Sequence, residues 1–132
     1  VGTQSLAVCI RRLSYNELNS GNKKIKHILT ELRNSMLIGL LVSILFFGVT
    51  YVYVLLSKSG GSFSPFYMAL VNAISIIVVI IVSGLFGCII PIMFDSIHVD
   101  PAAASGPFIT TINDIVALLI YFSLATLFLL GV

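Results

Sequence analysis

Three long apolar stretches constrain the fold of this chain more than any other feature. They cover residues 36–56, 66–94 and 107–132. Each is long enough to cross the hydrocarbon core of a bilayer as a helix, which takes about 20 apolar residues. A single open strand would leave its backbone groups without partners in lipid. The sequence therefore predicts an all-α fold, a polytopic transmembrane helical bundle with these three stretches as membrane spans.

The composition supports a lipid surrounding. Of the 132 residues, 58% are hydrophobic and 9% are charged, and the mean hydropathy is +1.12. A water-soluble domain of this size needs far more polar surface to cover its core. We therefore expect the lipid bilayer to surround the bundle.

The first twelve residues are apolar but too short to span a membrane. They lack the basic region that precedes the apolar part of a signal peptide. We interpret residues 1–12 as the end of a preceding membrane helix. On this interpretation residues 1–132 are a fragment of a transmembrane domain, with at least one further span upstream.

Basic residues predict the orientation in a plasma or inner membrane. Six of the seven precede the first long span, whereas Lys58 follows it. The positive-inside rule then places residues 11–35 in the cytoplasm and residues 57–65 outside. Alternation places residues 95–106 in the cytoplasm and the C-terminus outside. The six early cations are Arg11, Arg12, Lys23, Lys24, Lys26 and Arg33.

Residues 13–35 are predicted to form a basic cytoplasmic loop and the start of a helix. The helical pattern begins near Lys23 and continues into the first long span. Orientation and anchoring to acidic lipid explain the charges, with a polyanion site as the alternative. We expect no nucleic-acid partner.

Asp114 is a charge inside the third span. The three spans contain no Lys, Arg or His that could pair with it. An acid in this position costs several kcal/mol, so it normally faces the bundle interior or a wet cavity. It is therefore either protonated or in contact with water and a cation. Helical spacing puts Thr110, Ala117 and Tyr121 on its face.

Several polar or small residues in the spans also have simpler explanations. Thr110 can bond back to its own helix, and small residues such as Ala117 can serve close helix packing. Gly84 and Gly87 are likewise predicted to let another helix approach the second span closely.

The cysteines and one acidic segment are candidate metal sites. Cys9 and Cys88 show no CxxC spacing and no companion His in the sequence, so we expect buried small hydrophobes. Asp95, His98 and Asp100 offer ligand atoms, but their setting is typical of a solvated loop.

Three segments resemble the MgtE-type magnesium transporter family. The segment "DPAAASGPFITTINDIVALLIYFSLATLFL" is similar to the last membrane helix of the family, and "VGTQSLAVCIRRL" to the end of its second helix. The segment "NAISIIVVIIVSGLFGCIIPI" is similar to its fourth helix. The resemblance implies a homodimer with five membrane helices per subunit, in which the second and fifth helices line a central pore.

The same resemblance implies a binding site for the transported ion. Asp114 matches the pore acid that holds hydrated Mg²⁺, and Gly2, Gly106 and Thr110 match pore-lining positions. The residue chemistry agrees, because Mg²⁺ prefers oxygen ligands and usually keeps several waters.

We therefore expect a magnesium channel, not an enzyme. The alternative is a proton-coupled secondary transporter of divalent cations such as Mn²⁺ or Co²⁺, in which Asp114 carries the proton. A structural scaffold would leave Asp114 replaceable. An intramembrane aspartyl protease needs two acids, and the spans hold one.

Overall fold

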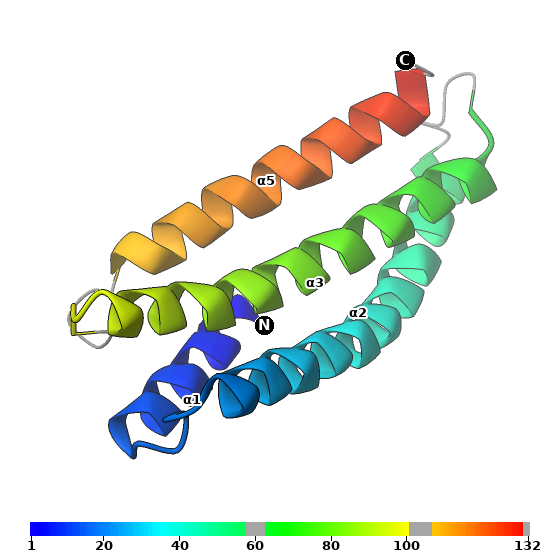
Figure 1. Ribbon diagram of the computed structural model, residues 1–132. Helices are drawn as coiled ribbons and strands as arrows, with labels where there is room; N and C mark the ends of the chain where they lie inside the picture. Colours follow the sequence, from blue (N-terminus) through cyan, green and yellow to red (C-terminus); the bar gives the residue numbers. More distant parts are fainter. Residues whose placement is uncertain (58–62, 101–106, 131–132) are drawn as a thin grey trace.

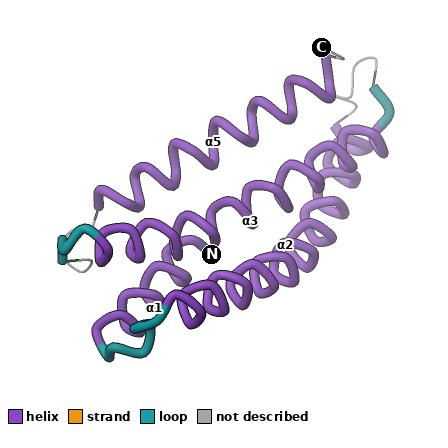
Figure 2. Tube along the Cα trace, in the orientation of Figure 1, coloured by secondary structure: helices purple, strands orange, loops and turns teal. Residues whose placement is uncertain are grey.

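The computed structural model describes residues 1–57, 63–100 and 107–130, and all regular secondary structure in these ranges is helical (Figures 1 and 2). The predicted all-α class is therefore confirmed. Three of the helices are long and apolar enough to cross a membrane. They contain the three predicted spans as far as residue 130.

The chain begins with two helices joined by a tight turn. Helix α1 covers Gly2–Ser14 and carries Arg11 and Arg12 in its last turn. Cations at this position stabilise a helix, because they interact with the negative end of its dipole. In the turn, Asn16 adopts a left-handed conformation with φ 53°, which Asn tolerates better than most residues. This turn leads directly into helix α2.

Helix α2 is much longer than the predicted span. It covers Gly21–Ser57, 37 residues, and is about 55 Å long at 1.5 Å per residue. The predicted continuation from Lys23 into the span is confirmed. Residues 13–35, predicted as a basic loop and the start of a helix, are helical up to Ser14 and again from Gly21.

Helices α3 and α5 form the rest of the bundle. Helix α3 covers Pro65–Ser96, and the Ser64 side chain accepts a hydrogen bond from the Tyr67 backbone N–H at 3.2 Å. Pro65 suits the first helical position, where no backbone N–H is needed. Helix α5 covers Pro107–Leu130.

Helix α3 is the central element of the bundle. It packs against α1, α2 and α5, with its most extensive contact on α2 (Figure 1). Helix α1 lies beside the part of α3 that ends at Ser96 and touches α5 only slightly. Contacts between α3 and its neighbours therefore position every candidate site.

Small and polar residues let the helices approach closely. On α2 the buried positions recur every four residues along one stripe: His27, Glu31, Ser35, Gly39 and Ser43. A Cβ added at Gly84 would collide with the Ser35 hydroxyl, and one added at Gly87 would collide with the Gly2 carbonyl oxygen. The prediction that Gly84 and Gly87 permit close approach is confirmed.

The outward faces of the long helices are apolar. On α2, Leu41, Leu45 and Leu56 are exposed, and on α5, Ile115, Leu119 and Phe122 are exposed. Large exposed apolar side chains are what a bundle in lipid presents to its surroundings.

Candidate ion-binding sites

Asp114 lies on the exposed side of α5, at the edge of the face that packs on α3. Its carboxylate makes no hydrogen bond or ion pair with any residue in the described ranges. Thr110, Ala117 and Tyr121, predicted to share its face, are half-buried. Within one chain the carboxylate is therefore open to a ligand or to another subunit.

Gly2 and Thr110 come together at the junction of α1, α3 and α5. They line a narrow crevice with no room for a water molecule. A Cβ at Gly2 would lie 2.5 Å from Ser83 Oγ and 2.8 Å from Asn113 Nδ2, so this position accepts only glycine without rearrangement. The crevice lining is Gly2, Thr3, Leu6, Gly87, Thr110 and Asn113, and does not include Asp114.

Gly106 and the hydroxyl of Thr110 are the remaining features of the predicted pore lining. Gly106 lies outside the described residues. The hydroxyl of Thr110 donates to the Pro107 carbonyl oxygen at 3.0 Å, and that of Thr111 does so at 2.6 Å. The prediction that Thr110 bonds back to its own helix is confirmed.

Asn113 was not predicted as a functional residue, yet it fixes the rotation of α5. Its Nδ2 donates to Ser83 Oγ on α3 at 2.9 Å. Its Oδ1 is buried and has no partner in the described part of the chain. Successive helical residues are rotated by about 100°, so directing Asn113 at α3 turns Asp114 away from it. The polar "TTIND" run was the sequence signal that could have identified it.

A second polar link joins three helices further along the bundle. Tyr121 Oη donates to Asn72 Oδ1 at 2.7 Å, and Asn72 Nδ2 donates to Thr50 Oγ1 at 2.6 Å. The chain of bonds runs from α5 through α3 to α2.

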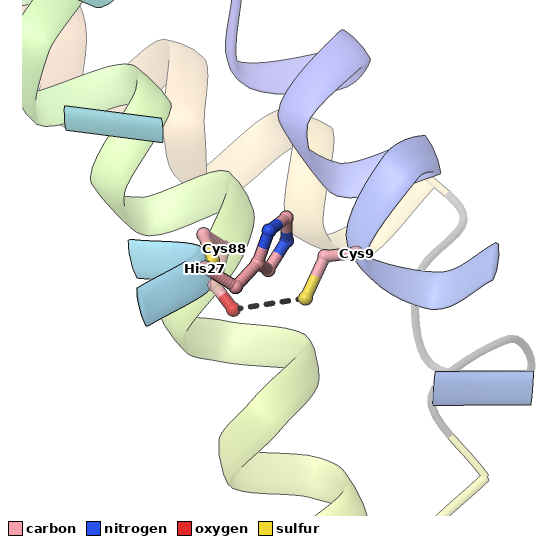
Figure 3. A group of neighbouring side chains, drawn as sticks. All are labelled: Cys9, His27 and Cys88. Atoms are coloured by element: carbon pink, nitrogen blue, oxygen red, sulfur yellow. Dashed lines mark hydrogen bonds between the residues drawn. The ribbon is translucent and has the colours of Figure 1, made fainter. Parts of the chain in front are cut away.

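Cys9, His27 and Cys88 form a separate cluster where α1, α2 and α3 meet (Figure 3). One potential ligand atom from each residue lies within 4.8 Å of the other two. Cys9 and Cys88 are fully buried, and His27 is 3% exposed. The premise that the cysteines lack a companion His is therefore wrong, although their predicted burial is confirmed.

His27 has one occupied and one unoccupied ring nitrogen. Arg12 Nη1 lies 3.4 Å from His27 Nδ1. A guanidinium only donates, so Nδ1 is the acceptor and a neutral ring carries its proton on Nε2. Nε2 is buried without a hydrogen-bond partner among the described residues. Such an orphaned donor costs about 1–3 kcal/mol.

The acidic segment begins in the last turn of α3 with Asp95. Asp95 accepts a hydrogen bond from Lys24 Nζ at 3.1 Å, and His98 is exposed in a left-handed conformation with φ 58°. Asp95, His98 and Asp100 do not form a metal-binding group in the described ranges. The interpretation of this segment as a solvated loop stays a prediction.

These features define the class of the molecule. The described helices form part of a multi-pass helical membrane protein with ionisable residues at helix junctions and on a membrane-spanning helix. The chain belongs to the MgtE family, described as divalent cation transporters, whose sequence model matches residues 1–124. The resemblance seen in the sequence is thereby confirmed.

Three relatives are similar to almost the whole chain. Each is named magnesium transporter MgtE: that of Bacillus subtilis is 43% identical over 128 residues, that of Enterococcus faecalis 38% over 131 residues, and that of Thermus thermophilus 30% over 128 residues. In each case the match covers 97% of this chain and 26% of the relative. The chain thus spans about a quarter of the length of these relatives.

Proposed function

We propose that the protein containing this chain carries Mg²⁺ across the plasma or inner membrane as a channel and has no enzymatic role. Membership in a family of divalent cation transporters supports this proposal, as do the three relatives named magnesium transporters. The ion passes through a central pore between two copies of the subunit, with Asp114 as the cation-binding acid.

The observation that carries the proposal is the position of Asp114. It is the single charged residue of the three predicted spans, and it is exposed and unpaired among the described residues. An uncompensated acid facing hydrocarbon costs several kcal/mol, so another subunit, water or a cation must cover it. A two-fold axis beside α5 brings a second subunit next to Asp114. The two carboxylates then face each other across a water-filled space that can hold a cation.

The chemistry of such a pore suits Mg²⁺. Two carboxylates bind the hydrated ion through its water shell, and Mg²⁺ gives up these waters reluctantly. The family resemblance adds Gly2, Gly106 and Thr110 to the lining. Within one chain, Gly2 and Thr110 line a crevice too narrow for water that does not include Asp114, so this part of the pore has to widen for the ion to pass. Selectivity then depends on pore width and field strength and needs no nitrogen or sulfur ligands. The membrane potential drives the ion inward.

Growth rescue tests this function. The full-length protein is expressed in a bacterial strain without its own magnesium transporters, on medium low in Mg²⁺. Wild type and the control Thr126→Val, an exposed polar residue of α5, are expected to restore growth, whereas Asp114→Asn is not. Equal membrane insertion of the three proteins is checked by immunoblot. Full rescue by Asp114→Asn would contradict the assignment of the pore acid.

The second candidate is a proton-coupled transporter of divalent cations such as Mn²⁺ or Co²⁺, with Asp114 as the proton carrier. The exposed carboxylate favours this candidate as much as it favours a pore. A pH gradient would drive transport by such a protein even at zero membrane potential.

A further inference from the structure

We propose that Cys9, His27 and Cys88 bind a thiophilic divalent cation of the Zn²⁺ class and thereby clamp α1 to α2 and α3. This site is distinct from the Asp114 face and does not depend on the proposed pore. It takes one ligand from each of three helices, so a bound ion adds a cross-link between helices that already pack on one another.

The geometry is close to that of a zinc site. Tetrahedral Zn²⁺ with bonds of about 2.3 Å to sulfur and about 2.0 Å to nitrogen separates neighbouring ligand atoms by about 3.5–3.8 Å. The ligand atoms of the cluster lie within 4.8 Å of one another, so an inward movement of about 1 Å completes the site. Three protein ligands leave the fourth position for water.

His27 supplies the independent sign of a ligand. Its Nε2 is buried and has no partner in the described ranges, while Nδ1 faces Arg12. When a metal ion binds His27 Nε2, the ring proton moves from Nε2 to Nδ1. Arg12 can then no longer donate to Nδ1 and turns toward Glu17. The Oε2 atom of Glu17 already lies 4.0 Å from Arg12 Nε. The orphaned nitrogen thereby gains a bond.

The surroundings favour a thiolate-binding ion over Mg²⁺. A cavity of about 290 Å³ leads to His27, and Arg12, Lys23 and Lys26 line it. Binding of one Zn²⁺ releases two thiol protons, so the net charge of the site does not change. The positive side chains of Arg12, Lys23 and Lys26 therefore oppose Zn²⁺ binding little. Mg²⁺ does not displace thiol protons and would be repelled. Nearby cations also stabilise thiolates.

Leu13, Leu18, Ile28 and Ile92 pack around the cysteines. This apolar shell limits water access and strengthens the ligand bonds. On the predicted topology the cluster is at the cytoplasmic end of the bundle, where reducing conditions keep the cysteines as thiols.

Optical titration of the full-length, detergent-purified protein with Co²⁺ under reducing conditions tests the proposal. We expect a cobalt–thiolate charge-transfer band that saturates at one ion per chain, is bleached by Zn²⁺, and persists in excess Mg²⁺. His27→Ala and Cys88→Ser are expected to weaken binding by more than the roughly 10–100-fold typical of losing an outer-shell partner. His98→Ala is the matched control, because His98 lies outside the cluster, and should bind as wild type does.

Alkylation of the wild-type protein covers the case in which the variants fail to fold. Zn²⁺ is expected to slow modification of Cys9 and Cys88 by a membrane-permeant maleimide and to raise the melting temperature. Absence of the thiolate band, or equal bands in wild type and a folded His27→Ala variant, would overturn the proposal. So would recovery of a Cys9–Cys88 disulfide from freshly isolated protein, because neither sulfur could then donate as a thiolate.

Discussion

At the scale of single residues, the glycines of α3 set how closely the helices approach. Gly87→Ala should be more damaging than Gly84→Ala, because its new Cβ meets the backbone of Gly2 and Leu6, whereas that of Gly84 meets the Ser35 side chain. Overpacking of this kind costs about 1–3 kcal/mol. The measurement is the melting temperature of the full-length protein in detergent.

Gly48→Ala is the matched control for this comparison. A Cβ at Gly48 meets nothing within 4 Å, and alanine favours the helix, so stability should stay equal or rise. Ser35→Ala is expected to rescue Gly84→Ala in part, because it removes the hydroxyl that collides. A Gly87→Ala variant as stable as Gly48→Ala would show that the helices are further apart than described.

At the scale of helices, the hydrogen-bonded series Tyr121–Asn72–Thr50 ties α5 to α3 and α2. Tyr121→Phe and Thr50→Val each remove one bond and should cost about 0.6 kcal/mol, with an upper range near 1.7 kcal/mol. Asn72→Ala removes both bonds and should cost about as much as the two together. A double-mutant cycle on thermal stability measures the coupling. Additive effects of Tyr121→Phe and Asn72→Ala would contradict a direct bond.

Much of the helical architecture could be predicted from sequence. The apolar stretches gave the three long helices, and the pattern after Lys23 gave the continuous α2. The role of Gly84 and Gly87 in close packing was also predictable, but their partners Ser35 and Gly2 were not. These contact partners depend on the angle and position at which two helices cross. The hydrophobic pattern of the sequence does not predict that geometry.

The candidate sites were likewise predictable only in part. Asp114 was identifiable because a charge in a span is costly. The family resemblance named Gly2 and Thr110 as pore-lining positions, and that role stays a prediction, since the crevice they share does not include Asp114. His27 was missed as a companion of Cys9 and Cys88 because the three residues belong to different helices. No local spacing signals a cluster that only tertiary packing assembles.

At the scale of the whole molecule, the proposed dimer places α5 beside its symmetry copy. Asp114→Cys in native membranes should give a covalent dimer with a short bifunctional maleimide. Leu119→Cys is the control, because Leu119 is 63% exposed but lies on another side of α5. Wild type measures the background from native cysteines, of which Cys9 and Cys88 are buried. Stronger cross-linking at Leu119 than at Asp114 would place a different face at the interface.

In the proposed channel, Asp114 binds Mg²⁺ in a passive pathway driven by the membrane potential. The most direct measurement is Mg²⁺ influx into liposomes that contain the full-length protein, under an imposed membrane potential, with and without a pH gradient. We predict that influx follows the potential, ignores the pH gradient, and falls about tenfold or more in Asp114→Asn, since each 1.4 kcal/mol of lost ion binding is tenfold. Influx driven by the pH gradient alone, or unchanged influx in Asp114→Asn, would contradict the claim.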